Sequence, residues 1–163
     1  MKKSKALIIK KLNLKEDISK KYQKWMNDPI VHKYTKQKYI YHSLESIKNF
    51  VREKNKSKEE YLYGIFLKKK NLNIHIGNIK LGPINWTHKS AYISYFIGVK
   101  KLWGCGYTTL AIMEIIKIAK YKKLKKLKAI FNKKNTGSKK VLVKNGFTIE
   151  RKKKSENVYS IMI

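Results

Sequence analysis

The 163-residue chain is long enough for one domain with a single core. Its hydrophobic content of 42%, without any apolar run near the roughly 18 residues of a membrane span, excludes a membrane-spanning or disordered protein. Its formal charge of +30 suggests a nucleic-acid partner, but all basic residues except Arg52 and Arg151 are lysines spread along the whole length. Readers of bases and phosphates favour the planar fork of arginine, so we expect an anionic cofactor or substrate rather than nucleic acid.

The N-terminus and the cysteine content indicate where the protein works. The apolar stretch 6–9 is too short for the core of a signal peptide. The single cysteine, Cys105, cannot pair within the chain, and no cluster of cysteines and histidines has zinc-binding spacing. We therefore expect one domain over residues 1–163, in the reducing cytoplasm and without a metal site.

The first half of the chain predicts one strand, two helices and two more strands. The first helix begins with the acids Glu16 and Asp17 and ends where Asn27-Asp28 precedes Pro29, and Ser43 can cap the second helix. The expected elements are a strand over 5–12, a helix over 16–26, a loop with a short helical turn over 30–42, a helix from 43, strands over 61–67 and 74–81, and a longer connection over 82–89.

Residues 89–121 change from one periodicity to another across a glycine-rich joint. The odd positions from Ala91 to Val99 are apolar, which predicts a strand with one buried face. From Leu110 onward the apolar residues recur at spacings of three and four, which predicts an amphipathic helix. A strand, a glycine turn and a helix start can bind an anion, because glycines let a ligand approach the backbone and the first helical amides have no internal partner.

Spacing distinguishes three phosphate-binding motifs for this joint. No stretch supplies the Walker pattern G-x-x-x-x-G-K-[ST]. A dinucleotide fingerprint needs a third glycine where Thr109 stands, and no acid follows about twenty residues on. The pattern that remains is [QRK]-x-x-G-x-G, from Lys101 to Gly106. A plain strand-to-helix turn would have a similar sequence.

The rest of the chain completes a mixed sheet. The expected elements are a buried strand over 127–131, a helix over 136–144 that ends at Asn145-Gly146, and two antiparallel strands over 147–150 and 158–163. The order is β-α-α-β-β-β-α-β-α-β-β. We expect an α+β fold, a single mixed and mostly antiparallel sheet of about seven strands flanked by about four helices.

Two glycine motifs about forty residues apart resemble those of the GCN5-related N-acetyltransferases. The first is Lys101-x-x-Gly104-x-Gly106, and the second runs from Asn135 through Ser138 to Lys144-Asn-Gly146-Phe147. Trp25-Met-Asn-Asp-Pro29 and Trp103 are similar to the branch that acetylates ribosomal-protein N-termini and, in relatives, nucleotide-linked amino sugars. The resemblance covers nearly the whole chain and implies the acyl-CoA N-acyltransferase fold.

The resemblance implies that an amine attacks the thioester of acetyl-CoA directly, through a tetrahedral oxyanion, with a thiolate leaving. Backbone groups of residues 97–99 would pair with pantetheine, the amides of residues 102–107 would hold the pyrophosphate, and Lys101 would supply counter-charge. Asn135 would contact the pantetheine arm and Lys144 the phosphates, unless Lys144 is one more solvated lysine. The implied coenzyme residues are Ile97, Gly98, Val99, Lys101, Leu102, Trp103, Gly104, Cys105, Gly106, Tyr107, Asn135 and Lys144.

The chain departs from the family pattern at the proton-transfer positions. Leu142 stands where many members have a tyrosine that protonates the thiolate, so the resemblance leaves Ser138 as the acid, unless its hydroxyl only caps the helix. Tyr92 stands where relatives often have a glutamate base. The base is therefore open, with His88, Tyr92, Glu45 and Asp28 as candidates and water as a relay. Cys105, the variable residue between two glycines, is not the expected nucleophile.

The acceptor is expected to be a primary amine. A lysine-rich protein attracts an anionic nucleotide-linked amino sugar more readily than a basic ribosomal tail, and this favours the sugar. A protein N-terminus is the alternative, and a nucleic-acid or ribosome-binding module that keeps the fold without the chemistry is another. A homodimer is left open. Four aromatic residues can line the acceptor pocket or belong to the core: Trp25, Tyr34, Tyr39 and Trp86.

Overall fold

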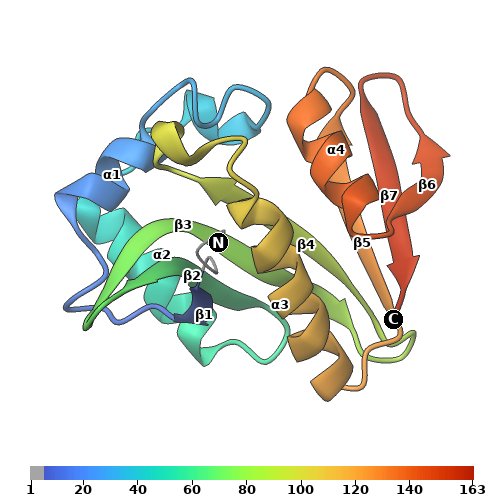
Figure 1. Ribbon diagram of the computed structural model, residues 1–163, viewed down its shortest axis with the longest axis horizontal. Coiled ribbons are helices and arrows are strands. Elements are labelled where there is room, and N and C mark those ends of the chain that lie inside the picture. The colour runs from blue at the N-terminus through green and yellow to red at the C-terminus, as the bar shows by residue number, and fades with distance from the viewer. Residues whose placement is uncertain (1–5) are drawn as a thin grey trace.

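A seven-stranded mixed sheet runs through the computed structural model, which describes residues 6–163 (Figure 1). The strand order is β1-β2-β3-β4-β5-β7-β6, and all neighbours are antiparallel except the parallel pair β4 and β5. The strands are β1 (Leu7–Lys11), β2 (Tyr61–Lys69), β3 (Leu72–Asn85), β4 (Ser90–Ile97), β5 (Lys126–Asn132), β6 (Thr148–Lys152) and β7 (Glu156–Met162). This confirms the fold class and the element order predicted from the sequence.

Four α-helices and two short 3₁₀ turns connect these strands. Ser43 caps α2 as predicted, since its hydroxyl accepts a hydrogen bond from the Ser46 amide. The helices are α1 (Lys20–Met26), α2 (Leu44–Lys56), α3 (Tyr107–Tyr121) and α4 (Thr136–Lys144), and the 3₁₀ turns are η1 (Lys36–Tyr39) and η2 (Lys100–Leu102). No helix between residues 6 and 163 has both the length and the hydrophobicity that crossing a membrane requires.

Two predicted boundaries were wrong. The first helix starts at Lys20 and not at Glu16, because the Asp17 carboxylate accepts a hydrogen bond from the Asn13 amide in a preceding turn, and Ser19 caps the helix instead. Strand β3 continues to Asn85 across a register shift, where a longer connection was expected. The first strand is observed over Leu7–Lys11, while residue 5 of its predicted range lies outside the described residues.

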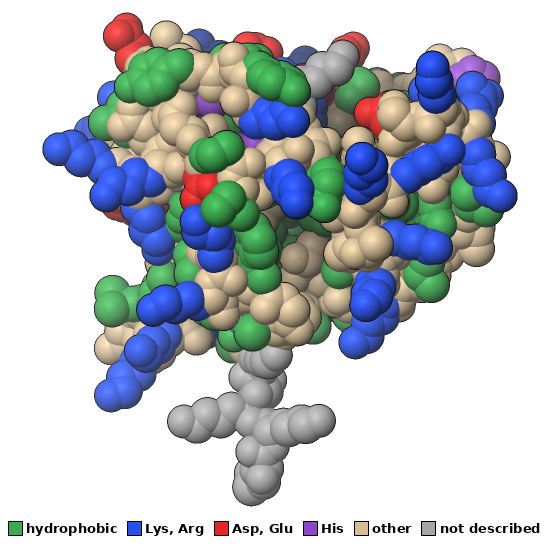
Figure 2. Space-filling view, turned by 90° about the horizontal axis from the view of Figure 1, so that it is seen from above, with side chains coloured by type: hydrophobic (Ala, Val, Ile, Leu, Met, Phe, Trp, Pro, Cys, Tyr) green, Lys and Arg blue, Asp and Glu red, His purple; other side chains and the backbone are tan. Residues whose placement is uncertain are grey.

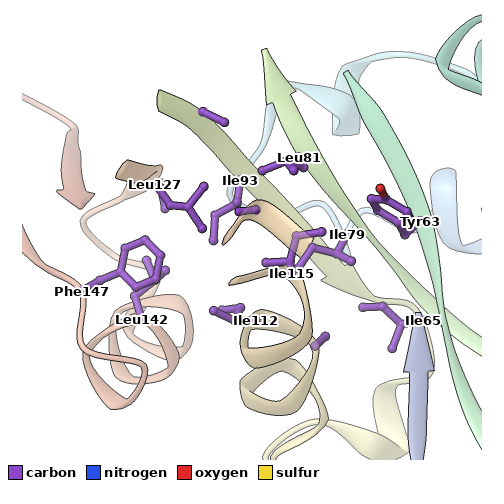
Figure 3. Packing of buried hydrophobic residues seen from close by; sticks show 14 of the residues in the cluster. Tyr63, Ile65, Ile79, Leu81, Ile93, Ile112, Ile115, Leu127, Leu142 and Phe147 are labelled. Atoms are coloured by element: carbon purple, nitrogen blue, oxygen red, sulfur yellow. The ribbon is translucent and has the colours of Figure 1, made fainter. Parts of the chain in front are cut away.

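Helices cover both faces of the sheet. Helix α3 packs on one face, where Ile112 and Ile115 point toward sheet residues such as Ile79 and Ile93 (Figure 3). Helices α1 and α2 pack on the other face around a second cluster that includes Phe66. Helix α4 runs alongside β5 and β7 in Figure 1. The sheet is therefore held between two apolar layers.

The sheet opens between β4 and β5. These strands pair only at Ser90–Lys126, Ala91–Leu127 and Tyr92–Lys128. Beyond these three pairs, β4 and β5 continue without pairing to each other and diverge toward the top of Figure 1. We call the space between them the wedge. It brings the C-terminal end of β4, the start of α3 and the start of α4 to one place.

Candidate functional site

A cleft of about 1130 Å³ opens at the wedge. The end of β4, the joint before α3, the start of α4 and the segment between α1 and η1 all contribute to its walls. Figure 2 looks onto this end of the molecule and shows Lys and Arg side chains around a central hollow that contains hydrophobic side chains. Residues that line it and bear on function are His32, Lys33, Tyr34, His42, Phe50, Lys80, Tyr95, Ile97, Gly104, Gly106, Asn135, Ser138, Lys140 and Lys144.

The start of α3 is open toward the cleft. Gly104 and Gly106 have φ angles of 73° and 84°, in the left-handed region that favours glycine, and Gly106 is the N-cap without any side-chain cap. A Cβ atom at either glycine would meet no atom within 4 Å, so space lies in front of this backbone. Among the described residues, the amides of Gly104, Gly106 and Thr108 have no hydrogen-bond acceptor. Such a helix start can bind an anion.

Part of the joint is already hydrogen-bonded to itself. The amides of Leu102, Trp103 and Cys105 donate to the carbonyls of Val99, Lys100 and Leu102. Within the predicted range 102–107, the amides of Gly104 and Gly106 are therefore the ones left for a ligand. The Trp103 indole N–H also donates to the Ile97 carbonyl, over 2.8 Å.

The joint is anchored to α1. The Lys100 ammonium lies 2.8 Å from the Asp28 carboxylate, and this hydrogen bond is the main cause of the lowered pKa of Asp28. Asp28 also accepts hydrogen bonds from the amides of Ile30 and Val31. The Trp25 ring packs against the backbone of Gly98 so closely that a Cβ atom there would overlap the indole. These contacts fix the end of β4 before it turns into the joint.

The start of α4 has a side-chain cap, unlike that of α3. The Asn135 Oδ1 accepts a hydrogen bond of 3.0 Å from the Ser138 amide. From the sequence, capping this helix was the alternative role of Ser138. The structure gives that role to Asn135. The Ser138 hydroxyl is left for other contacts, and it neighbours the hydroxyl of Tyr95 on β4.

Tyr95 brings a buried phenol to the wedge. Its hydroxyl has no hydrogen bond of good geometry among the described residues. Burial raises the pKa of Tyr95 to about 12, and the nearby Ser138 side chain partly offsets this rise. The phenol therefore stays protonated at neutral pH and can donate a hydrogen bond into the cleft.

Two histidines lie on the opposite wall. His32 is 3% exposed and His42 is half-buried, and the Nε2 atoms of both have no hydrogen-bond partner among the described residues. Burial, followed by the neighbouring His42, lowers the pKa of His32. Sequence analysis missed both residues because segment 30–42 has no clear periodicity. Their only signal was the presence of two histidines in one aromatic loop.

The cleft brings together most of the predicted coenzyme residues. Those that line it are Ile97, Leu102, Trp103, Gly104, Gly106, Tyr107, Asn135 and Lys144, together with Ser138. Gly98, Val99, Lys101 and Cys105 lie in the same segment but do not line it. The Cys105 thiol is 4.0 Å from the Lys101 carbonyl oxygen.

The candidate bases do not line the cleft. His88 lies in the turn before β4, and Tyr92 belongs to the last residue pair that joins β4 to β5, so both are at the closed end of the wedge. Glu45 is in the first turn of α2, and Asp28 is occupied by Lys100. The structure therefore does not bring any of the four to Ser138.

The four aromatic candidates for the acceptor pocket lie in different parts of the structure. Tyr34 lines the cleft. Trp25 is buried in the core beneath the end of β4, and Trp86 lies in the turn between β3 and β4. Tyr39 is exposed and lines a smaller neighbouring hollow with Met26. Phe50 of α2 lines the cleft as well.

Comparison with known proteins gives a family for this arrangement. The family model described as an acetyltransferase (GNAT) domain matches residues 6–148. No curated protein sequence matches the chain.

Three solved structures share the fold. A ribosomal L7/L12 α-N-protein acetyltransferase in complex with coenzyme A is 18% identical, with a TM-score of 0.85 over 98% of this chain and 96% of that one. A microcin C7 self-immunity acetyltransferase in complex with acetyl-CoA and AMP is 19% identical, with a TM-score of 0.80 over 96% and 92%. A spermidine N-acetyltransferase from Vibrio cholerae in complex with CoA and spermine is 16% identical, with a TM-score of 0.79 over 96% and 95%. At these identities the likeness is one of fold.

Proposed function

The chain belongs to the GNAT family of acetyltransferases, and on that premise we propose that it acetylates the amine of a nucleotide-linked amino sugar. It is an N-acetyltransferase, and acetyl-CoA is its acetyl donor. In direct transfer the protein positions both substrates, stabilises the charge that develops on the acetyl oxygen, and moves protons.

The open start of α3 fits the pyrophosphate of the donor. The space in front of Gly104 and Gly106 and the unpartnered amides there suit an anion, and the helix dipole adds a favourable field. Lys140 and Lys144 on α4 line the same cleft and can supply positive charge. These residues of the chain bind and orient the donor, while the thioester supplies the acetyl group.

The positive charge of the cleft is the observation that favours one acceptor over the others. Among the described residues, no Asp or Glu side chain lines it, whereas Lys33, Lys80, Lys140 and Lys144 do. Lys80 is already paired with Glu60, which leaves three lysines for a ligand. A polyamine would need carboxylates to balance its charges, so this cleft is unsuited to one. A phosphate-bearing acceptor is favoured instead.

Lys33 is the lysine best placed to meet the acceptor. It lies on the segment between α1 and η1, which lines the cleft together with α4. Its ammonium is 5.4 Å from the centre of the Tyr34 ring. Tyr34 and Phe50 also offer partly exposed aromatic faces on which a nucleobase can stack. A protein N-terminus is the competing acceptor, because the L7/L12 α-N-protein acetyltransferase shares the fold.

Ser138 is the proposed proton donor to the departing thiolate. Its hydroxyl is not used to cap α4, because Asn135 performs that role. The Tyr95 hydroxyl beside it is protonated and can resupply or orient the Ser138 proton. Leu142, at the position of the usual family tyrosine, is fully buried and has no proton to donate.

A thiol-release assay tests the proposal. The wild-type protein is given acetyl-CoA with UDP-glucosamine as the first nucleotide-linked amino sugar, an N-terminal peptide, or spermidine. We expect kcat/KM to be at least about tenfold higher for the nucleotide sugar, a difference of roughly 1.4 kcal/mol in transition-state stabilisation. A preference for the peptide or for spermidine would refute the sugar as acceptor.

A charge reversal in the cleft sharpens the assay. Lys33→Glu should raise KM for the nucleotide sugar about tenfold and leave the affinity for acetyl-CoA unchanged. Lys120→Glu on the exposed last turn of α3 makes the same change in net charge outside the cleft. It should leave both values unchanged, so a general effect of net charge can be separated from a local contact.

A further inference from the structure

His32 brings a buried imidazole to the wall of the cleft. It comes from the segment between α1 and η1, is almost fully buried, and lines the cleft. Its ring packs edge-on against Phe96 of β4, with ring centroids 5.2 Å apart. Phe96 lies beyond the last residue pair between β4 and β5. The imidazole is therefore held against the part of β4 that borders the wedge.

The contacts of His32 with Thr35 favour one tautomer of its ring. The Thr35 hydroxyl donates its single proton to the His32 carbonyl oxygen, over 3.3 Å. The Thr35 Oγ1 also lies 3.5 Å from the His32 Nδ1, and toward that nitrogen it can only accept. With the Thr35 hydroxyl proton directed at the carbonyl, we assign the ring proton to Nδ1, and this tautomer leaves the Nε2 lone pair free. This Nε2 is buried and has no partner among the described residues.

The surroundings of His32 keep the imidazole neutral. Burial and the adjacent His42 lower its pKa, and the Trp25 carbonyl and Asp28 raise it by less. Asp28, the carboxylate that acts on His32, is held by Lys100. Since no carboxylate among the described residues lines the cleft, the two histidines are the side chains there whose ordinary pKa suits proton uptake near pH 7.

We propose that His32 is the general base of the acetyl transfer and that its Nε2 accepts the proton lost by the acceptor amine. The inference rests on the proposed function, because it assumes an amine acceptor in this cleft. As the nitrogen–carbon bond forms, the carbon–sulfur bond breaks and its electron pair leaves on sulfur. One proton passes from the amine nitrogen to Nε2, and one reaches sulfur from Ser138 or water. The His32 proton then returns through water to the Ser138 alkoxide or the hydroxide that was formed, so protons and charges balance.

A histidine base also limits how basic the acceptor amine can be. A histidine with a pKa below the ordinary value of about 6.5 takes a proton efficiently only from an amine of low basicity. An α-amine, with a pKa near 8, or a comparably weak sugar amine meets that condition. A lysine-like amine with a pKa near 10.4 is mostly protonated at neutral pH and is a poor match.

The test compares His32→Gln with His88→Gln, whose imidazole does not line the cleft. Wild-type kcat/KM for UDP-glucosamine should fall at acidic pH with an apparent pKa below 6.5. His32→Gln should remove that acidic limb and lower kcat about a hundredfold or more, with unchanged calorimetric affinity for acetyl-CoA. His88→Gln should keep both the rate and the limb. In the ligand-free wild type, ¹⁵N NMR should find the His32 proton on Nδ1 at pH 7.

Several results would overturn the assignment. One is a His32→Gln protein that retains the wild-type rate and acidic limb. Another is the transfer of this phenotype to His42→Gln or His88→Gln, and a third is an NMR spectrum with the His32 proton on Nε2. A failure of the proposed acceptor looks different, because wild type would then turn over the peptide or spermidine in place of the sugar while the NMR result stood.

Discussion

Two helices begin at the same cleft, and their N-termini are satisfied in opposite ways. Asn135 caps α4 from within the chain, by accepting a hydrogen bond from the Ser138 amide. Helix α3 begins at Gly106 without a side-chain cap and with space in front of its first amides. A capped start needs no ligand and can hold a side chain in place, whereas the amides of an open start are left to water or to an external anion. This difference supports the proposal that α3 binds the donor while α4 positions Ser138.

The largest expected effect comes from closing the open start. Gly106→Glu should weaken acetyl-CoA binding at least about a hundredfold, roughly 2.7 kcal/mol, because the side chain would occupy the phosphate space and repel its charge. Gly106→Ala is the matched control, since it has the same unfavourable backbone conformation but no charge. Titration calorimetry measures both. Equal affinities for Gly106→Glu and wild type would remove the joint from the donor site.

The second effect concerns the residue that the capped start positions. Ser138→Ala should lower kcat by about ten- to a hundredfold, or 1.4 to 3 kcal/mol of barrier, while KM for either substrate changes little. Ser138→Thr keeps the hydroxyl and should recover most of the rate. Steady-state kinetics on one preparation provide the measurement. An unchanged kcat in the alanine variant would leave water as the donor to the thiolate.

The cap itself should affect stability. Asn135→Ala removes the acceptor for the Ser138 amide and should cost about 1 kcal/mol, or roughly 2–4 °C in Tm for a domain of this size. Asn135→Asp supplies an equivalent oxygen and should stay close to wild type. Thermal unfolding followed by circular dichroism distinguishes them. If the alanine variant unfolds at the wild-type temperature, the Asn135 cap does not stabilise the start of α4.

The smallest effect concerns the ion pair that anchors the open start. Asp28→Asn should lower the free energy of unfolding by less than about 1 kcal/mol at pH 7, because Lys100 is half-exposed. The folded-state pKa of Asp28 is lowered, so its contribution is present above the unfolded value near 3.9 and is lost as pH falls through the folded value. Denaturant titrations should therefore show a difference at pH 7 that disappears in acid. A difference that persists there would exclude charge pairing as its cause.

Much of the architecture could be predicted from periodicity and turn residues. The seven strands, the glycine joint and the bounds of α4 follow from patterns within short stretches. The start of α1 could not be predicted this way, because Glu16 and Asp17 suit a helix start, whereas the observed Asp17 bond to Asn13 depends on how the turn folds.

The site was predictable only where it is local. The open joint is one continuous stretch, and Asn135 and Ser138 are three residues apart. Tyr95 was placed in a buried face by period two, and only the early end of β4–β5 pairing opens its hydroxyl to the cleft. His32 faces Phe96 from 64 positions earlier in the chain. A single sequence gives no signal for a contact between residues so far apart in the chain.

The wedge also affects which sheet edges another polypeptide can reach. Unpaired strand edges invite aggregation, and charged residues on an edge strand oppose it. The outer strands have such protection, since β1 ends in Lys10 and Lys11 and the fully exposed β6 carries Arg151, Lys152 and a register shift. The edges of β4 and β5 beyond their three pairs face each other inside the molecule, where a foreign strand has poor access. Part of the lysine excess therefore helps the outer strands β1 and β6 to resist self-association. The edges of β4 and β5 inside the wedge remain available to an extended ligand.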